Sequence, residues 1–422
     1  MTEKNFENYQ ISRLDNGIRV ISEKIPGFKS ISLGIWVLSG TRNESKEFNG
    51  ITHLIEHLVF KGTKNRSNRD IAIEFDSIGA DFNAFTDKEN SCFYCDFIDI
   101  YLDKCCELLF DIVLNPLFLP ESLETEKNII LEEIKMIEDS PSDEIFNYFY
   151  EIILKQHPLS FPILGTKKSL LSIKIDDVWN YFKKTFVFEN MVVSAAGNVS
   201  HSELVKTIEN KIKNFDYHAF NEEKSIYFSP EASRDFKIIR KKIKAANLCL
   251  GSVGCDRRNK NKYPLTVLMN LLGGSVSSRF FQKIREDMGL AYSIAAGNTQ
   301  YTDTGIIDIY AASDPKNTGK IIKIIYDEIN DIRKTGLKEI ELQRAKENIK
   351  GGIVLNMEVI SSRMFRFGKS LLMDNDVLPI ENILSKIDLV SIDDVHAAAN
   401  KFLDTEKMGT VIMGEVSKRG LI

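Results

Sequence analysis

The sequence predicts an α+β fold: two alike domains, each a mixed sheet with helices packed on it, that arose by internal duplication. Two observations support this prediction. Strand patterns alternate with long amphipathic helix patterns throughout the chain, and the second half repeats the order of the first. With an offset of 214 residues, segment 51–58 falls on 265–272, and both segments keep the same apolar face. The predicted boundaries are 1–215 for the first domain, 216–234 for a polar linker and 235–422 for a degenerate second domain.

The first half begins with a hairpin, because Asn16-Gly17 favours a tight turn between strands at 11–14 and 18–21. A third strand is expected at 30–38, and a polar loop then leads into an amphipathic helix that contains residues 51–58. The remaining elements follow from their periodicity and end signals. They are a helix at 68–78, strands at 81–86 and 91–97, helices at 100–114, 120–138 and 143–155, and a strand at 192–196. In the second half, helices are expected at 316–334 and from 338 to about 358.

Composition and charge exclude several classes of protein. The formal net charge is −5, and no cluster of Lys and Arg is present, so we do not expect a nucleic-acid-binding protein. No apolar run approaches the roughly 18 residues that span a bilayer, so no membrane anchor is expected. The first residues lack the apolar core of a secretory signal, and we therefore expect a cytoplasmic protein.

The six cysteines are predicted to be reduced packing residues, because their spacing matches no disulfide framework. Cys92 and Cys95 resemble a CxxC pair. They lie in an alternating strand pattern, however, where a separation of three residues would point the two sulfurs to opposite faces. A metal or redox role for the pair is therefore not expected.

The segment His53-Leu54-Ile55-Glu56-His57 is the one stretch whose spacing indicates a definite chemistry. On a helix, His53, Glu56 and His57 share the face opposite the apolar residues of 51–58. Two imidazoles four residues apart can bind one Zn²⁺, with the carboxylate between them beside the metal. His-x-x-Glu-His is also the inverted form of a zinc peptidase signature. The alternative is that two histidines share one helix face by accident, and a third ligand would decide between the two interpretations.

The helix predicted at 120–138 supplies candidates for the third ligand. A separation of seven residues returns a helix to nearly the same direction, so Glu126 and Glu133 share an otherwise apolar face. Glu132 points away from that face. A carboxylate directed inward is costly unless it is paired or bound to metal, so Glu133 is the better ligand candidate and Glu126 a supporting group. The alternative is an ordinary solvated acidic edge of a helix.

With these residues on the page, the chain resembles the pitrilysin, or inverzincin, peptidases, which include insulin-degrading enzyme and the mitochondrial processing peptidase. Their pattern is His-x-x-Glu-His followed 74 to 76 residues later by a Glu within a Glu-Glu pair, and His57 precedes Glu133 by 76 residues. The resemblance covers the whole chain and is closest to the small bacterial members with two domains. It implies one Zn²⁺ per chain on His53, His57 and Glu133, with Glu56 as general base and Glu126 as a second acidic site residue.

Two further stretches are implied to handle a peptide substrate. Segment 81–86 alternates like an exposed edge strand, and the family uses the equivalent of Asn83, Ala84 and Phe85 to bind an extended peptide as an added strand. The alternative for this segment is an ordinary strand of the sheet. In the second half, Arg285 and Tyr292 match the family's Arg-x6-Tyr, whose members hold substrate from the domain that lacks zinc. Taken alone, these two residues are only a helix residue and an aromatic at the entry to a strand.

The predicted function is a zinc-dependent endopeptidase that hydrolyses peptides or extended protein segments with a metal-activated water. The alternative is a catalytically silent partner subunit of the same fold, but a silent subunit has no need to keep His53, Glu56, His57 and Glu133 together. Larger family members enclose substrate between two such two-domain halves. A chain of 422 residues supplies only one half, so a homodimer with shared active sites is expected.

Overall fold

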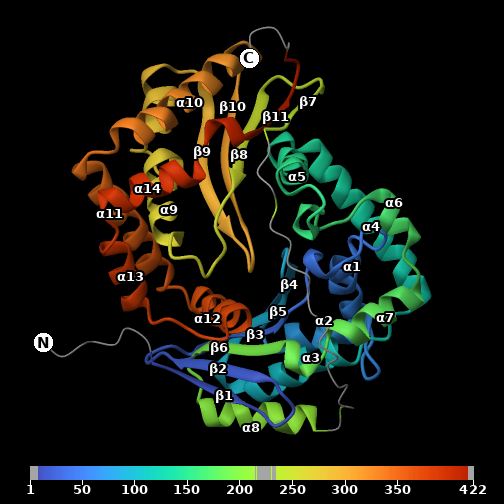
Figure 1. Ribbon diagram of the computed structural model, residues 1–422. Helices are drawn as coiled ribbons and strands as arrows, with labels where there is room; N and C mark the ends of the chain where they lie inside the picture. Colours follow the sequence, from blue (N-terminus) through green and yellow to red (C-terminus); the bar gives the residue numbers. More distant parts are fainter. Residues whose placement is uncertain (1–7, 214, 216–229, 231–233, 417–422) are drawn as a thin grey trace, which may run out of the picture. The chain divides into compact units, whose positions relative to one another are not determined.

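The computed structural model describes residues 8–213, 215, 230 and 234–416 (Figure 1). The chain divides into two compact units that are not continuous in sequence. Unit 1 comprises Met1–Ile134, Phe161–Lys224 and Leu355–Glu381, and unit 2 comprises Lys135–Ser160, Ser225–Val354 and Asn382–Ile422. The predicted linker at 216–234 lies outside the described residues except at positions 230 and 234.

Unit 1 contains a mixed sheet in the order β1-β2-β6-β3-β5-β4, in which only β2 and β6 run parallel. The hairpin predicted at Asn16-Gly17 is present, and Gly17 adopts the positive φ of 99° that its turn requires. The strands are β1 (Tyr9–Arg13), β2 (Arg19–Lys24), β3 (Ser30–Val37), β4 (Asp81–Thr86), β5 (Ser91–Ile98) and β6 (Met191–Gly197).

Unit 2 contains a sheet in the order β7-β11-β8-β10-β9, in which only β7 and β11 run parallel. Without β1, the sheet of unit 1 has the same order and the same single parallel pair. This shared topology supports the internal duplication that the sequence predicts. The strands are β7 (Phe236–Ile239), β8 (Ala246–Val253), β9 (Ala291–Gln300), β10 (Gly305–Ser313) and β11 (Gly409–Met413).

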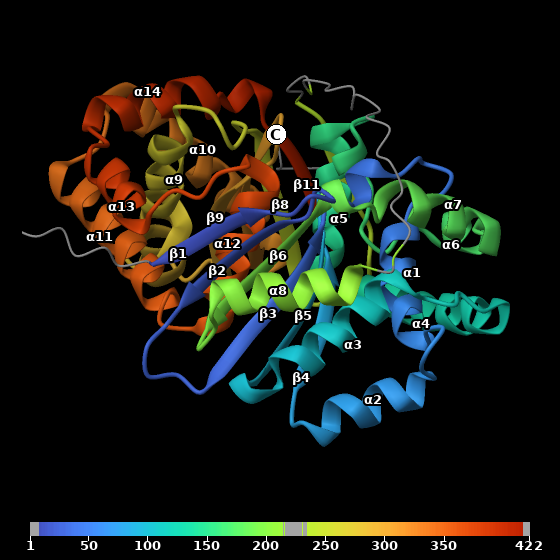
Figure 2. The same ribbon diagram turned by 90° about the horizontal axis from the view of Figure 1, so that it is seen from below.

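Helices cover both faces of the sheet in unit 1. One face carries the larger apolar core, and Figure 2 shows α3 and α8 running across it. The opposite face packs against α12 (Ile360–Asp374), which comes from late in the chain. The helices on the side of the larger core are α1 (Ile51–Leu58), α2 (Asn68–Ser77), α3 (Leu102–Leu114), α4 (Pro120–Asp139), α6 (Lys167–Ser172), α7 (Ile175–Thr185) and α8 (His201–Ile212).

Unit 2 has the same layers. Its larger core includes two short π-helical segments, η6 (Asn270–Gly274) and η7 (Phe281–Asp287), and its opposite sheet face packs against α5 (Pro141–Leu154). The other helices of the larger core are α9 (Lys262–Met269), α10 (Thr318–Thr335), α11 (Glu339–Asn356), α13 (Ile380–Asp388) and α14 (Ile392–Phe402).

Each sheet therefore receives one covering helix from the other half of the chain. Glycines on the equivalent strands β3 and β8 allow the close approach of these helices. A Cβ atom on Gly34 would lie 2.6 Å from Met364 Sδ of α12, and one on Gly251 would lie 2.7 Å from Phe149 Cζ of α5. Both positions thus exclude a larger side chain for the same reason.

The predicted α+β class with two alike sheets is confirmed, and most predicted elements of the first half lie within a few residues of the observed ones. Cys92 and Cys95 lie in different apolar cores on opposite faces of β5, and all six cysteines are free and buried. Sequence analysis did not predict α6, α7, α8, α12, α13 or α14. Among the described residues, no helix is both long and apolar enough to cross a bilayer.

Candidate metal centre

Helix α1 is anchored from both its side and its N-terminus. Its four apolar residues at 51, 54, 55 and 58 are buried, as their spacing predicts. Gly50 precedes the helix and has no side chain to cap it, so the buried Glu44 carboxylate supplies the acceptors. Glu44 accepts hydrogen bonds of 2.8 Å from Gly50 N and 2.9 Å from Thr52 N. The histidine face of α1 is thereby held in place.

His53, His57 and Glu133 converge on one point in unit 1. Nε2 of His53 lies 3.8 Å from Glu133 Oε2, and Nε2 of His57 lies 3.6 Å from Glu133 Oε1. One ligand atom from each residue lies within 4.8 Å of the other two. Two imidazole nitrogens and one carboxylate form the donor set of catalytic zinc sites that keep one coordination position open. The residues present therefore fit the metal that the sequence predicts.

Glu126 supports His57 from behind. Its carboxylate is 1% exposed and accepts a 3.0 Å hydrogen bond from His57 Nδ1, because an ionised carboxylate has no proton to donate. This bond leaves the lone pair of His57 on Nε2, the atom that faces Glu133. On the other oxygen, Glu126 forms a 2.8 Å ion pair with Lys61 Nζ. Lys61 thus balances the charge of a carboxylate that has almost no access to water.

Glu56, the predicted general base, lies beside this group and is held by the sheet. Thr86, the last residue of β4, donates a 2.5 Å hydrogen bond to Glu56 Oε2. Burial raises the pKa of Glu56, the Thr86 hydrogen bond and His57 lower it, and the Glu133 carboxylate raises it. Burial and the neighbouring His57 lower the pKa of His53 to about 3, so His53 is neutral near pH 7 and can offer a lone pair.

The predicted substrate strand β4 lies at the edge of the sheet in unit 1. Asn83 is exposed and its Oδ1 accepts a 2.8 Å hydrogen bond from Ala84 N. The ring of Phe85 points away from α1, since it packs 5.7 Å from Trp36 and 5.8 Å from Phe365 between ring centroids. A peptide added to β4 would thus meet the backbone of this strand and the small Ala84 side chain, and the ring of Phe85 belongs to the apolar core.

Arg285 and Tyr292 belong to unit 2. Arg285 is exposed on η7, with its guanidinium 4.7 Å from the centroid of the Phe281 ring. Tyr292 is 67% exposed near the start of β9. The described contacts do not connect either residue with the histidine cluster, and their role toward substrate stays a prediction.

Sequence analysis missed three residues that organise the site. Lys61 carried a usable signal, because it follows His57 by four residues and so lies near the same helix face. Thr86 carried a weaker one, since it directly follows the predicted substrate residues. Glu44 had none, because its loop reaches the start of α1 only through the fold.

Comparisons with known proteins agree with this geometry. Residues 19–167 match the model of the insulinase family, peptidase family M16, and residues 172–349 match the model of the M16 inactive domain. An uncharacterized zinc protease of Bacillus subtilis, YmxG, is 34% identical over 388 residues, which cover 92% of this chain and 93% of that protein. An uncharacterized zinc protease of Streptomyces coelicolor is 33% identical over 94% of this chain and 88% of that protein.

Solved structures show the same fold. The crystal structure of a protease from Helicobacter pylori superposes with a TM-score of 0.92 at 20% identity and covers 97% of this chain and 99% of its own. An M16 inactive domain structure from Pseudomonas fluorescens gives a TM-score of 0.90 at 19% identity, covering 97% of this chain and 98% of its own.

Proposed function

The chain belongs to peptidase family M16, and from this membership we propose that it is a zinc-dependent endopeptidase acting on peptides or extended protein segments. The observation that carries the proposal is the convergence of His53, His57 and Glu133, with Glu56 beside them. When bound there, zinc supplies a Lewis acid that polarises a peptide carbonyl and makes a water molecule more acidic.

The chain's own residues supply the remaining chemistry. Glu56 accepts the proton of the attacking water and delivers it to the leaving amine. Thr86 keeps one oxygen of Glu56 occupied, so the other oxygen is available for this transfer. Glu126 holds the His57 ring in the orientation that directs Nε2 toward Glu133. An extended substrate would lie along β4, the edge strand that ends at Thr86.

The test compares the wild-type protein with Glu56→Gln, measuring zinc content and cleavage of a quenched fluorescent peptide library. We expect about one zinc per chain in both proteins and hydrolysis only in the wild type, because an amide cannot accept the proton. The exposed acid Glu132 provides the matched control, and Glu132→Gln should keep both properties. Wild-type protein that binds zinc but cleaves nothing would favour the silent-subunit alternative.

We further propose that two copies form a twofold pair in which Arg285 and Tyr292 of one copy serve the zinc of the other. The exposure of both residues and the family's use of paired two-domain halves support this proposal. Mixing Glu56→Gln with Tyr292→Phe under conditions of subunit exchange creates one complete site in each mixed pair. Activity should then recover to roughly a quarter of wild type by random assortment. Demonstrated exchange without recovery would exclude shared sites.

A further inference from the structure

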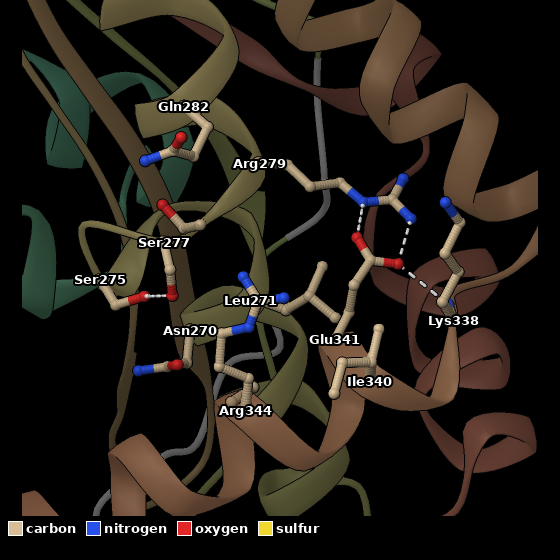
Figure 3. A pocket seen from close by; sticks show the side chains of 12 residues that line it. Asn270, Leu271, Ser275, Ser277, Arg279, Gln282, Lys338, Ile340, Glu341 and Arg344 are labelled. Atoms are coloured by element: carbon tan, nitrogen blue, oxygen red, sulfur yellow. Dashed lines mark hydrogen bonds and ion pairs between the residues drawn. The ribbon is translucent and has the colours of Figure 1, made fainter. Parts of the chain in front are cut away.

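Unit 2 contains a polar cavity of about 300 Å³ that the proposed peptidase reaction does not use (Figure 3). The two π-helical segments η6 and η7 contribute to its walls, together with the first half of α11. A π-helical turn is rare and occurs mostly at functional sites, because the wider turn sacrifices regular hydrogen bonding. Two such segments around one cavity therefore call for a functional explanation.

The charge of the cavity is positive, because its one acidic residue is already saturated. Glu341 accepts hydrogen bonds of 2.8 and 3.0 Å from Arg279 Nε and Nη2, and a third from Lys338 N at 2.9 Å. Arg344 has no hydrogen bond or ion pair with any described residue. Figure 3 shows its side chain rising from α11 beside Leu271, toward the middle of the lining residues. One guanidinium is thus free to bind a ligand.

Two buried polar atoms in the wall also lack partners among the described residues. Ser278 is 3% exposed and its Oγ makes no hydrogen bond there. Asn270 Oδ1 is likewise buried and unpartnered, while its Nδ2 donates to Asn348 Oδ1 at 2.9 Å. Leaving such atoms unsatisfied costs about 1–3 kcal/mol each. A ligand with acceptor oxygens and an O–H group would satisfy both atoms as well as Arg344.

The place of the cavity in the fold gives an independent reason to expect a ligand. Helix α9 with η6 follows the strand equivalent to the one before α1, and α11 follows α10 as α4 follows α3. In unit 1, the helix pair α1 and α4 presents the donors of a cation site. In unit 2, the equivalent pair presents Arg344, and Leu271 stands at the position of His57. The same framework thus carries the opposite charge.

We propose that this cavity binds a small oxyanion, with hydrogen phosphate or a phosphate monoester as the best chemical match. The guanidinium of Arg344 would pair with two ligand oxygens. The Ser278 hydroxyl would donate to a further oxygen, and the protonated oxygen of the ligand would donate to Asn270 Oδ1. The glycines of Gly273-Gly274-Ser275 take no part. A Cβ atom on Gly273 would lie 2.6 Å from Ala296 N, so this glycine is required by packing.

The experiment titrates inorganic phosphate, and separately acetate, into the full chain by calorimetry in a buffer without other oxyanions. It compares wild type with Arg344→Gln, Ser278→Ala and the matched control Arg258→Gln, an exposed arginine of unit 2 outside the cavity. We expect saturable binding of phosphate that weakens at least about tenfold in Arg344→Gln and Ser278→Ala. Arg258→Gln should bind as the wild type does.

Acetate separates the two classes of oxyanion, because it lacks the O–H group that Asn270 Oδ1 would accept. Weaker binding of acetate than of phosphate supports the assignment to phosphate, and tighter binding of acetate overturns that assignment. No saturable binding of either anion, or equal affinity in wild type and Arg344→Gln, would overturn the site itself. The melting temperature of each variant without anion shows whether it folds. The titration requires no peptidase activity, so its outcome is independent of the proposed function.

Discussion

The Thr86 hydroxyl donates a 2.5 Å hydrogen bond to Glu56 Oε2, which connects the edge strand β4 directly to the carboxylate beside the two histidines. Ser91 Oγ lies 3.2 Å from Thr86 Oγ, and Ser91 donates its own proton to the carbonyl of Ser39 at 2.9 Å. The proton of Thr86 is therefore left for Glu56. The strand that would receive substrate thus also orients the base.

Replacing Thr86 by Val should lower kcat by roughly 10- to 100-fold, because Glu56 loses a charge-assisted hydrogen bond and with it a defined orientation. KM and zinc content should change little, since no zinc ligand is altered. Thr86→Ser keeps the hydroxyl and should restore most of kcat. Steady-state kinetics on one quenched peptide measures both constants, and an unchanged kcat in Thr86→Val would assign Thr86 to packing alone.

Removing the charge of Lys61 should weaken zinc binding. In Lys61→Met, the buried Glu126 carboxylate loses its ion pair and holds His57 less well, which typically costs about 10- to 100-fold in metal affinity. Lys61→Arg should retain most of the affinity. The exposed Lys64 in the same loop gives the control Lys64→Met. Competition with a zinc chelator measures all four proteins, and equal affinities in the two methionine variants would contradict the role of Lys61.

Glu133 and Glu132 are neighbours with different environments. Glu133 faces both histidines, while Glu132 is exposed on the other side of α4. Glu133→Gln should therefore reduce zinc affinity by more than about 100-fold, and Glu132→Gln should leave it nearly unchanged. The same chelator titration decides the ranking. A larger loss in Glu132→Gln would overturn the helical-face assignment.

The lowered pKa of His53 predicts how the metal-free protein responds to acid. The folded state keeps His53 neutral down to about pH 3, whereas the unfolded chain takes up a proton near pH 6.5. The unfolded state thus binds more protons between these values, and the free energy of unfolding should fall as the pH drops through this window. His53→Leu removes the titration. Denaturant unfolding of both metal-free proteins at several pH values should show a shallower decline in the variant, and parallel curves would contradict the shift.

The local parts of the site were accessible from sequence because they depend on helix geometry. The spacing of His53 and His57 and the separation of seven between Glu126 and Glu133 each determine a shared face without knowledge of the fold. The partners of Lys61 and Thr86 were not accessible. Their contacts join segments that meet only after the sheet has formed, and a polar side chain shows no periodicity that names its partner.

The same reason explains the helices that were missed or left without a place. An apolar stripe shows that a helix such as α12 is buried, but it does not show which sheet buries it. The exchange of α5 and α12 between the two sheets follows from the path of the chain.

That exchange has a consequence for how the protein is made. The face of the first sheet that carries Trp36 and Cys92 is covered by Met364 and Phe367 of α12, which leave the ribosome long after the strands themselves. At ~5–20 residues per second, this apolar face waits on the order of ten seconds for its cover. The nascent chain therefore offers a binding surface to chaperones during translation. A truncated chain that ends before α12 should aggregate instead of yielding a separate metal-binding unit.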